Sequence, residues 1–273
     1  MLILSGDHIY KMDYAKMLKY HKQKGADCTI AVLDVPLEEA SRFGIMSIDD
    51  EGRIFKFEEK PKKPESTKAS MGIYIFTKEK LARYLNADAA DPASANDFGK
   101  NIIPAMLAAG ENMFAYRFDG YWKDVGTIGS LWEANMDLLG DEPEFSMSDE
   151  KWRIYTRHNA LAPQYIGDDA RIENSIVSEG CEIHGRVENS VLFAGVKVLP
   201  GAVVRDSVVM SGTVVGRGAT VSYSVIDTEV EIGAGASVGG SRGCKDGIAV
   251  IGAGEKVEDG TTVAAGAMIP DVR

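Results

Sequence analysis

The stretch LSGDHIYKMDY, residues 4 to 14, places a carboxylate where α/β proteins often bind ligands. An apolar strand runs directly into Asp7, and a helix is expected to follow from Asp13. In open α/β sheets the binding crevice lies beyond the carboxyl ends of the strands, so an acid there can hold a metal ion or accept from a sugar hydroxyl. Asp7 also fits a helix cap or turn acid, because aspartate is frequent in both.

A second pair of charged residues ends another expected strand. Glu59 and Lys60 are followed by Pro61, which stops the ladder and directs both side chains into a loop. A carboxylate can accept from hydroxyls, and a lysine ammonium can neutralise a phosphate. Since Lys62 and Lys63 follow, these charges by themselves equally fit a solvated loop.

The first half of the chain alternates strands and helices. Strand-like runs are expected at residues 28–35, 53–59 and 71–76, and helices are expected to start near Asp13, Lys78, Asn101 and Ile128. This alternation favours a mostly parallel sheet covered by helices. Asp13 should cap the first helix, with Tyr14, Met17 and Leu18 on its buried face.

The second half repeats itself. A five-residue theme recurs as IENSI, VENSV, VRDSV and VSYSV, starting at residues 172, 187, 204 and 221. Of 29 glycines, 18 follow Ala160, and they punctuate single aliphatic residues. Short β-branched segments turning at small residues with a near-constant period predict a parallel β-helix. An antiparallel sandwich is the alternative, but it would alternate polar and apolar residues more clearly.

Composition sets limits on function. The 273 residues carry a formal net charge of -11, which argues against nucleic acid as a partner. The three cysteines lie far apart, without metal-ligand spacing, which fits a reducing cytoplasm. No apolar stretch approaches the roughly 20 residues of a membrane helix, and the first residues are too few for a signal peptide.

Several motifs, in order, resemble bacterial glucose-1-phosphate adenylyltransferase, also called ADP-glucose pyrophosphorylase. They are SGDHIYKMDY, RFGIM, FEEKP, SMGIYIF, DFGKNIIP and YWKDVGT, and the resemblance extends over essentially the whole chain. It implies part of a Rossmann-like nucleotidyltransferase domain with a mixed sheet over residues 1–140. A linker over 141–162 and a left-handed β-helix of hexapeptide repeats over 163–273 would follow.

One feature of the family does not match. The family carries a glycine-rich loop with an arginine, which grips the ATP phosphates, and a base-recognition segment. Both are expected upstream of residue 1. We therefore expect this chain to correspond to a partial form with little activity alone.

The resemblance implies a reaction in α-glucan (glycogen) biosynthesis, in which ATP and glucose 1-phosphate give ADP-glucose and pyrophosphate. Such transfer depends on positioning and on neutralising phosphate charge. Asp7 and Asp124 are the expected Mg²⁺ ligands, since Mg²⁺ often takes only one or two carboxylates, and Lys60 is the expected contact to the sugar phosphate. His8 receives no catalytic role, because an ionised phosphate needs no base. The remaining positions implied for the sugar site are Gly44, Glu59, Ser70, Asp97, Tyr121 and Trp122.

Each of these residues could instead have a purely structural role. Asp97 is an expected helix cap, Ser70 and Gly44 fit strand entries, and aromatic residues before a turn are often core. The β-helix holds no comparable cluster. By resemblance it supports a tetramer of identical or related subunits and relays allosteric effectors.

Three alternatives stay open. The chain could be a non-catalytic regulatory subunit of the same enzyme, although the presence together of Asp7, Lys60 and Asp124 argues against this. It could act on another hexose 1-phosphate, such as mannose 1-phosphate with GTP. It could instead be a hexapeptide acyltransferase, which would use His158 or His184, the histidines in or near the repeats.

Overall fold

The computed structural model describes residues 1–147, 149–156 and 160–270. It divides into two compact units, Met1–Trp122 and Lys123–Arg273, with the division inside a short strand. The domain limits expected from the sequence, 1–140, 141–162 and 163–273, stay predictions, and part of the expected linker lies outside the described residues.

The first unit is built on one six-stranded sheet in the order β5-β4-β6-β3-β7, with β1 paired to β6. Strands β2 and β8 form a separate two-stranded sheet. These strands are β1 (Leu2–Ile3), β2 (His8–Tyr10), β3 (Cys28–Asp34), β4 (Gly44–Ile48), β5 (Ile54–Glu59), β6 (Lys68–Phe76), β7 (Met113–Arg117) and β8 (Trp122–Asp124).

The expectation of a mostly parallel sheet is wrong, and the mixed sheet implied by the family resemblance is present. Strands β3 and β7 run parallel, whereas the pairs β1–β6, β3–β6, β4–β5 and β4–β6 are antiparallel. The physical reason is a tight turn. The Asp49 carboxylate accepts from the backbone N–H groups of Glu51 and Arg53, at 3.0 and 2.8 Å, and folds β4 and β5 into a hairpin.

The helices begin close to where the sequence predicts. The Asp13 carboxylate accepts from the Ala15 N–H at 3.0 Å and caps α1, and Gly25, with φ 56°, ends it. The helical elements are α1 (Tyr14–Lys24), a 3₁₀ turn η1 (Ala40–Arg42), α2 (Lys78–Ala89), a π-helical turn η2 (Phe98–Ile102), α3 (Ile103–Ala108) and α4 (Ile128–Met136).

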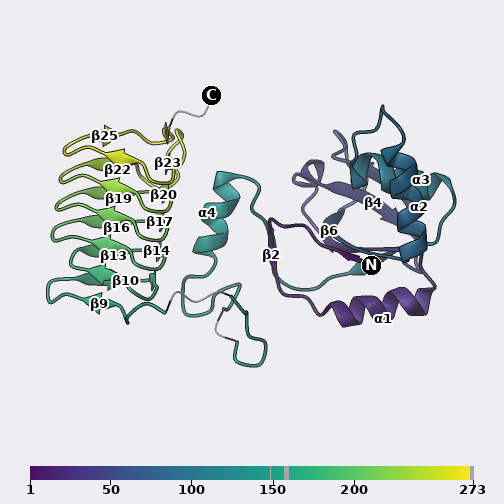
Figure 1. Cartoon of the computed structure of the whole chain (residues 1–273), viewed down its shortest axis with the longest axis horizontal. Coiled ribbons are helices and arrows are strands. Elements are labelled where there is room, and N and C mark those ends of the chain that lie inside the picture. Colours follow the sequence, from purple (N-terminus) through teal and green to yellow (C-terminus); the bar gives the residue numbers. More distant parts are fainter. Residues whose placement is uncertain (148, 157–159, 271–273) are drawn as a thin grey trace. The chain divides into compact units, whose positions relative to one another are not determined.

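Helices cover both faces of the sheet. In Figure 1, α1 lies on one side, and α2 and α3 lie on the other. Residues alternate between the faces as a strand requires, so Ala31 packs with Met17 of α1, whereas Ile30 packs with Leu81 of α2. The expected burial of Leu18 is wrong, since its side chain is 41% exposed. The buried face of α1 is centred instead on Met17 and on His21 one turn later.

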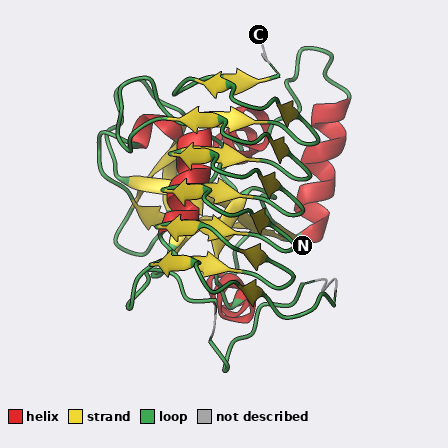
Figure 2. Cartoon of the chain, turned by 90° about the vertical axis from the view of Figure 1, so that its left-hand side faces the viewer, coloured by secondary structure: helices red, strands yellow, loops and turns green. Residues whose placement is uncertain are grey.

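The second unit contains a parallel β-solenoid, whose strands stack in ranks in Figure 2. Among the described residues it has three six-stranded sheets whose paired strands run parallel, so the antiparallel sandwich is excluded. The first sheet holds β10 (Arg171–Glu173), β13 (Arg186–Glu188), β16 (Val203–Arg205), β19 (Thr220–Ser222), β22 (Ser237–Gly239) and β25 (Thr262–Val263). The second holds β11 (Ile176–Val177), β14 (Val191–Leu192), β17 (Val208–Val209), β20 (Ser224–Ile226), β23 (Ala249–Ile251) and β26 (Met268–Ile269). The third holds β9 (Tyr165–Ile166), β12 (Glu182–Ile183), β15 (Lys197–Val198), β18 (Val214–Val215), β21 (Glu231–Ile232) and β24 (Lys256–Val257).

The repeated theme explains the corner between the first two sheets. Its third residue always has a left-handed backbone, with φ between 42° and 48° at Asn174, Asn189, Asp206 and Tyr223. Its fourth residue is always serine, and each serine hydroxyl donates to the carbonyl two residues back. The same oxygen accepts the backbone N–H of the serine in the next coil, so every coil holds the next in register.

Helix α4 packs on the solenoid within the second unit. The Trp132 side chain contacts Val208 and Val225, and its indole N–H donates to the Asp206 carbonyl at 2.8 Å. The Tyr223 ring meets the Trp132 ring edge-on at 5.1 Å. Burial of this large indole with a satisfied N–H attaches α4 to the repeats. A search of the described helices for one that could cross a membrane finds none.

Candidate functional site

Asp7 lies in the turn between β1 and β2 and is accessible to a ligand. Its side chain is 61% exposed, and the Ser5 hydroxyl donates to its Oδ1 at 2.5 Å. This hydrogen bond is the main cause of a lowered pKa; slight burial opposes it and the nearby His8 adds to it. Asp7 therefore carries a negative charge at neutral pH, as a cation ligand must.

Asp124 ends β8, the strand that pairs with β2. Its Oδ1 accepts from the Gly126 N–H at 2.8 Å, so this carboxylate also stabilises the turn that follows β8. Asp7, His8 and Asp124 each offer one ligand atom, and these atoms all lie within 4.8 Å of one another. Two carboxylates and an imidazole suit a divalent cation, because they supply hard oxygen donors and one nitrogen donor.

His8 is the member of this group to which the sequence assigned no role. Its Nδ1 lies 2.8 Å from the Met71 carbonyl oxygen, and in the neutral tautomer Nδ1 donates that proton. The lone pair is then on Nε2, 3.5 Å from Asp7 Oδ1. Metal-binding histidines commonly hold their second nitrogen in this way. Its position next to Asp7 was the feature of the sequence that could have indicated a place in this group.

Gly72 makes the room that His8 occupies. A Cβ at Gly72 would lie 3.2 Å from His8 Cε1 and 3.2 Å from Ser5 Cβ, and the glycine has φ 66°. Both the backbone conformation and the close approach favour glycine here.

Glu59 lies at the end of β5, directly across the ladder from Gly44 of β4. The carboxyl group is half-buried, and this burial raises its pKa; Lys60 opposes the shift and Asp97 adds to it. Within the described residues, no hydrogen bond or ion pair is found for its carboxylate. A half-buried acid without a partner has acceptor capacity left for a ligand.

Lys60 has a left-handed backbone, with φ 48°, and its N–H donates to the Phe43 carbonyl at 3.1 Å. A non-glycine residue in this region is uncommon and costs free energy. The strained turn ends β5 at Glu59, as the following proline predicts, and leaves the Lys60 side chain exposed.

Ser70 and Asp97 have identifiable local roles. The Ser70 side chain is 9% exposed, and its hydroxyl lies 3.5 Å from the Tyr74 hydroxyl and accepts from the Gly72 N–H at 3.3 Å. The Asp97 carboxylate accepts from the Lys100 N–H at 2.9 Å, so the expected helix cap is confirmed, although the element it caps is the π-helical turn η2.

Tyr74 is a residue of this region that sequence reasoning missed. Its ring stacks on Phe98 of η2 at 5.7 Å, and burial raises its pKa. Its place four residues after Ser70 on β6 was the available signal.

Trp122 contacts the group around Asp7, and Tyr121 precedes it as a half-buried residue. The indole meets the His8 ring edge-on at 5.0 Å and the Phe43 ring at 5.4 Å. It also packs against apolar core residues, so the interpretation of this aromatic residue as part of the core is confirmed in part. Its Nε1 is buried and, in the part of the chain that the structure describes, has no hydrogen-bond partner. Buried donors are normally satisfied.

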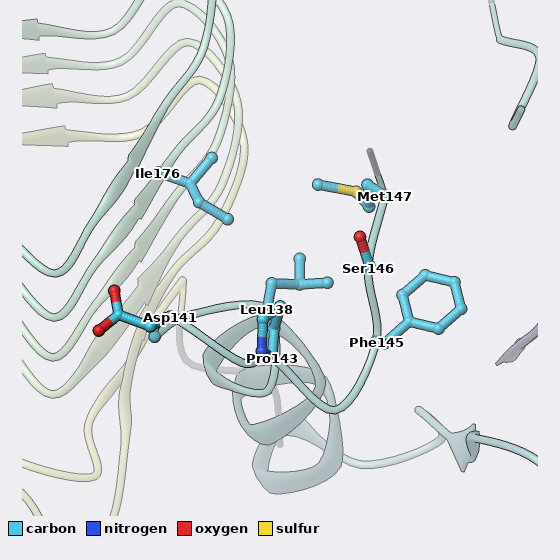
Figure 3. Close-up of a pocket in the computed structure, with 8 residues that line it drawn as sticks. Leu138, Asp141, Pro143, Phe145, Ser146, Met147 and Ile176 are labelled. Carbon is cyan, nitrogen blue, oxygen red and sulfur yellow. The ribbon is translucent and has the colours of Figure 1, made fainter. Parts of the chain in front are cut away.

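A cavity of 590 Å³ lies in the second unit. It is lined by Leu138, Asp141, Pro143, Phe145, Met147 and Ile176, among others, and Figure 3 shows its mainly apolar side chains. Among the described residues of this lining Asp141 is the one ionisable group, so they form no catalytic constellation.

The acyltransferase alternative depends on two histidines. His158 lies outside the described residues. The His184 ring packs against Tyr165 at 5.6 Å.

Comparisons with known proteins agree with the fold. Residues 1–141, more than half of the chain, match the family model described as nucleotidyl transferase. Residues 163–246 match the model described as GlmU-like, C-terminal hexapeptide.

Several similar curated proteins carry the same name. Proteins named glucose-1-phosphate adenylyltransferase from Clostridium perfringens (strain SM101 / Type A), Clostridium beijerinckii and Bacillus cereus (strain Q1) are 61%, 57% and 57% identical over 206 residues. The match extends over 76% of this chain and over 53%, 53% and 55% of those proteins, so the chain spans about half the length of the curated relatives it matches. Nucleotidyltransferases of this kind generally use divalent metal ions. On the family match and the mixed sheet together, this chain belongs to the nucleotidyl transferase family.

Proposed function

We propose that this chain takes part in adenylyl transfer from ATP to glucose 1-phosphate, which yields ADP-glucose and pyrophosphate for α-glucan synthesis. The observation that carries the proposal is the grouping of Asp7, His8 and Asp124 within 4.8 Å in a member of the nucleotidyl transferase family. The names of the relatives support the choice of substrates.

In the proposed reaction an oxygen of the sugar phosphate attacks the α-phosphorus of ATP in line, and pyrophosphate leaves. The nucleophile is already an anion, so no general base is needed. Asp7 and Asp124 would hold Mg²⁺, which when bound neutralises charge on the phosphates. The His8 ring would be held beside Asp7 by its hydrogen bond to the Met71 carbonyl.

The sugar phosphate would lie toward Glu59 and Lys60. The unpartnered Glu59 carboxylate can accept from sugar hydroxyls, and the exposed Lys60 ammonium can neutralise the sugar phosphate. We assign Gly44, Ser70, Asp97, Tyr121 and Trp122 to the same site. The buried Trp122 N–H supports this assignment because it lacks an acceptor among the described residues.

We further propose a tetramer of identical or related subunits, with allosteric control and a cytoplasmic location. The support is the solenoid, whose stacked coils present flat, repeated surfaces suited to pairing between subunits. Light scattering on the purified chain measures the oligomeric state directly, and a monomer at all concentrations would contradict the proposed tetramer.

The function is tested first by binding. Titration calorimetry with glucose 1-phosphate in the presence of Mg²⁺ should detect a complex, and mannose 1-phosphate should bind more weakly. Mn²⁺, which is followed by electron paramagnetic resonance, should bind to the wild type and much less to an Asp7→Asn/Asp124→Asn variant. Absence of glucose 1-phosphate binding at millimolar concentration would contradict the proposal.

Turnover separates the alternatives. Pyrophosphate release from ATP should require glucose 1-phosphate and a divalent ion. Binding of the sugar phosphate without release would instead support the regulatory subunit. A preference for GTP with mannose 1-phosphate would support another hexose 1-phosphate transferase, and transfer from acetyl-CoA to an amino sugar would support the acyltransferase.

A further inference from the structure

The Glu59 carboxylate lies against two glycines from different elements. A Cβ at Gly99 would lie 2.4 Å from Glu59 Oε2 and 2.8 Å from its Cδ. A Cβ at Gly44 would lie 2.9 Å from the same Oε2. All three distances are shorter than real Cβ contacts, so the carboxylate occupies space that any other residue at these positions would fill.

The two glycines are not explained by backbone conformation. Neither has the left-handed φ for which glycine is usually required. Gly44 begins β4, and Gly99 lies within the π-helical turn η2, and in both settings glycine is less stable than alanine by roughly 0.5 to 1 kcal/mol. What the chain gains at these positions is the absence of a side chain.

The carboxylate in this space has no interaction partner within the described part of the chain. Glu59 has no hydrogen bond or ion pair among the described residues. Asp97 Oδ1 lies 3.4 Å from the position of a Cβ at Gly99, in ordinary van der Waals contact, and the charges of Lys60 and Lys100 lower the pKa of Glu59. A half-buried carboxylate held without a partner indicates that its position serves a ligand.

We propose that Gly99 is a positioning residue for Glu59: the missing Cβ sets the depth of the carboxylate and so its reach to a hydroxyl of the sugar phosphate. This inference rests on the proposed function. Gly44 contributes to the same space but is a poorer probe, because a Cβ there would also lie 2.6 Å from the Phe57 ring. At Gly99 the opposing atoms belong to the flexible end of Glu59, so an added methyl group displaces the carboxylate and leaves the fold in place.

The test is a double-mutant cycle with glucose 1-phosphate as the ligand. Gly99→Ala should weaken binding at least tenfold while the melting temperature stays within about 2 °C. Glu59→Asp should also weaken binding. In the Glu59→Asp background, whose carboxylate is one methylene shorter, Gly99→Ala should change the Kd less than threefold, because the clash is gone. Binding of Mn²⁺ should be unchanged throughout.

Two controls interpret the cycle. Gly129→Ala in α4 adds a methyl group whose closest contact is Thr127 Oγ1 at 3.9 Å, so it should leave sugar phosphate binding unchanged. A ¹³C-NMR titration of Glu59 should show its pKa falling toward the ordinary value in Gly99→Ala, since the displaced carboxylate is better solvated.

Different experimental results would overturn the positioning role of Gly99 and the proposed function. Equal tenfold losses from Gly99→Ala in both backgrounds, or wild-type binding by Gly99→Ala, would overturn the positioning role. If the wild type itself does not bind glucose 1-phosphate, the proposed function fails. The Glu59 titration then decides the inference, and an unchanged pKa in Gly99→Ala would overturn it.

Discussion

Polar side chains inside the solenoid are satisfied by the chain itself, whereas two in the α/β unit have no partner among the described residues. Ser190, Ser207 and Ser224 are fully buried, and each hydroxyl donates to the carbonyl two residues back. The Ser190 and Ser207 hydroxyls also accept the N–H of the serine in the next coil. In the α/β unit the Glu59 carboxylate and the Trp122 N–H lack partners among the described residues. The comparison teaches that polarity and burial alone do not mark a site; polar groups left for a ligand do.

The two units also use strained backbone differently. In the solenoid the left-handed residues recur at the third position of the theme, where they turn each coil. In the first unit Lys60 and Asn96 have the same conformation, Lys60 at the end of β5 next to Glu59 and Asn96 next to Asp97. Periodic strain is a feature of architecture, whereas these two residues adjoin positions of the candidate site.

The largest effect is expected for Asp124→Asn. The amide oxygen still accepts from the Gly126 N–H, so the turn survives, but the ionised ligand is lost. We expect Mn²⁺ affinity and any pyrophosphate release to fall at least about 100-fold, with an unchanged melting temperature. Asp49→Asn, which preserves the turn between β4 and β5, is the matched control and should behave as wild type. Undiminished Mn²⁺ binding by Asp124→Asn would remove Asp124 from the site.

Ser207→Ala tests a buried polar side chain of the solenoid whose hydrogen bonds are made within the chain. The hydroxyl donates to the Arg205 carbonyl and accepts from the Ser224 N–H, so its loss leaves a buried donor unsatisfied. We expect a loss of about 1 to 3 kcal/mol in the free energy of unfolding, measured in urea, and no change in sugar phosphate binding. Ser175→Ala, at the less buried first serine of the ladder, should cost less. Equal costs at the two positions would mean that burial does not set the energy of the ladder.

Glu111→Gln tests whether a perturbed pKa by itself marks function. Hydrogen bonds from Lys80, Arg83 and Tyr84 surround this carboxylate, and chiefly the contact with Lys80 lowers its pKa to about 2. Because the folded pKa lies below the unfolded value, ionised Glu111 stabilises the fold above pH 4.5, and the contribution is lost as pH falls toward 2. We expect the variant to lose roughly 1 kcal/mol at pH 7, and to differ less from wild type at pH 3.

The pH dependence separates this network from a site. Unfolding midpoints at pH 7, 4.5 and 3 should converge as the pH falls, while glucose 1-phosphate binding at pH 7 is unaffected by Glu111→Gln. Weakened sugar phosphate binding would show that the Glu111 network acts on the site.

Glu59→Gln is expected to stabilise the fold slightly, an effect opposite in sign to that of Glu111→Gln. Burial raises the pKa of Glu59, so ionising it costs stability as pH rises above the unfolded value of 4.5. The neutral amide should therefore stabilise the chain at pH 7, by no more than about 1 kcal/mol because the group is only half-buried, and the gain should vanish below pH 4.5. Thermal melts at pH 7 and 4 measure this. A destabilised variant at pH 7 would show that Glu59 has a favourable partner in the folded chain.

Much of the fold followed from local pattern. The repeated theme predicted the parallel repeats because each coil buries its own aliphatic residues against the next, and the helix starts followed from local capping by residues such as Asp13. The prediction of a mostly parallel sheet was wrong because strand-like runs can be joined either by a hairpin turn, as at Asp49, or by a crossover helix. The periodicity of the strands is the same in both cases. Leu18 was misplaced because the buried stripe of α1 depends on what the sheet presents to it.

For the candidate site, the available residue types could be read from the sequence: the aspartates, the Glu59–Lys60 pair before proline, and the glycines. Which of them meet depends on the tertiary structure. Pairing of β2 with β8 brings Asp7 and His8 beside Asp124, and the packing of η2 against β5 places Gly99 next to Glu59. Residues separated by 40 or more positions come within a few ångströms through sheet register and side-chain packing, and no local pattern along the chain encodes those distances.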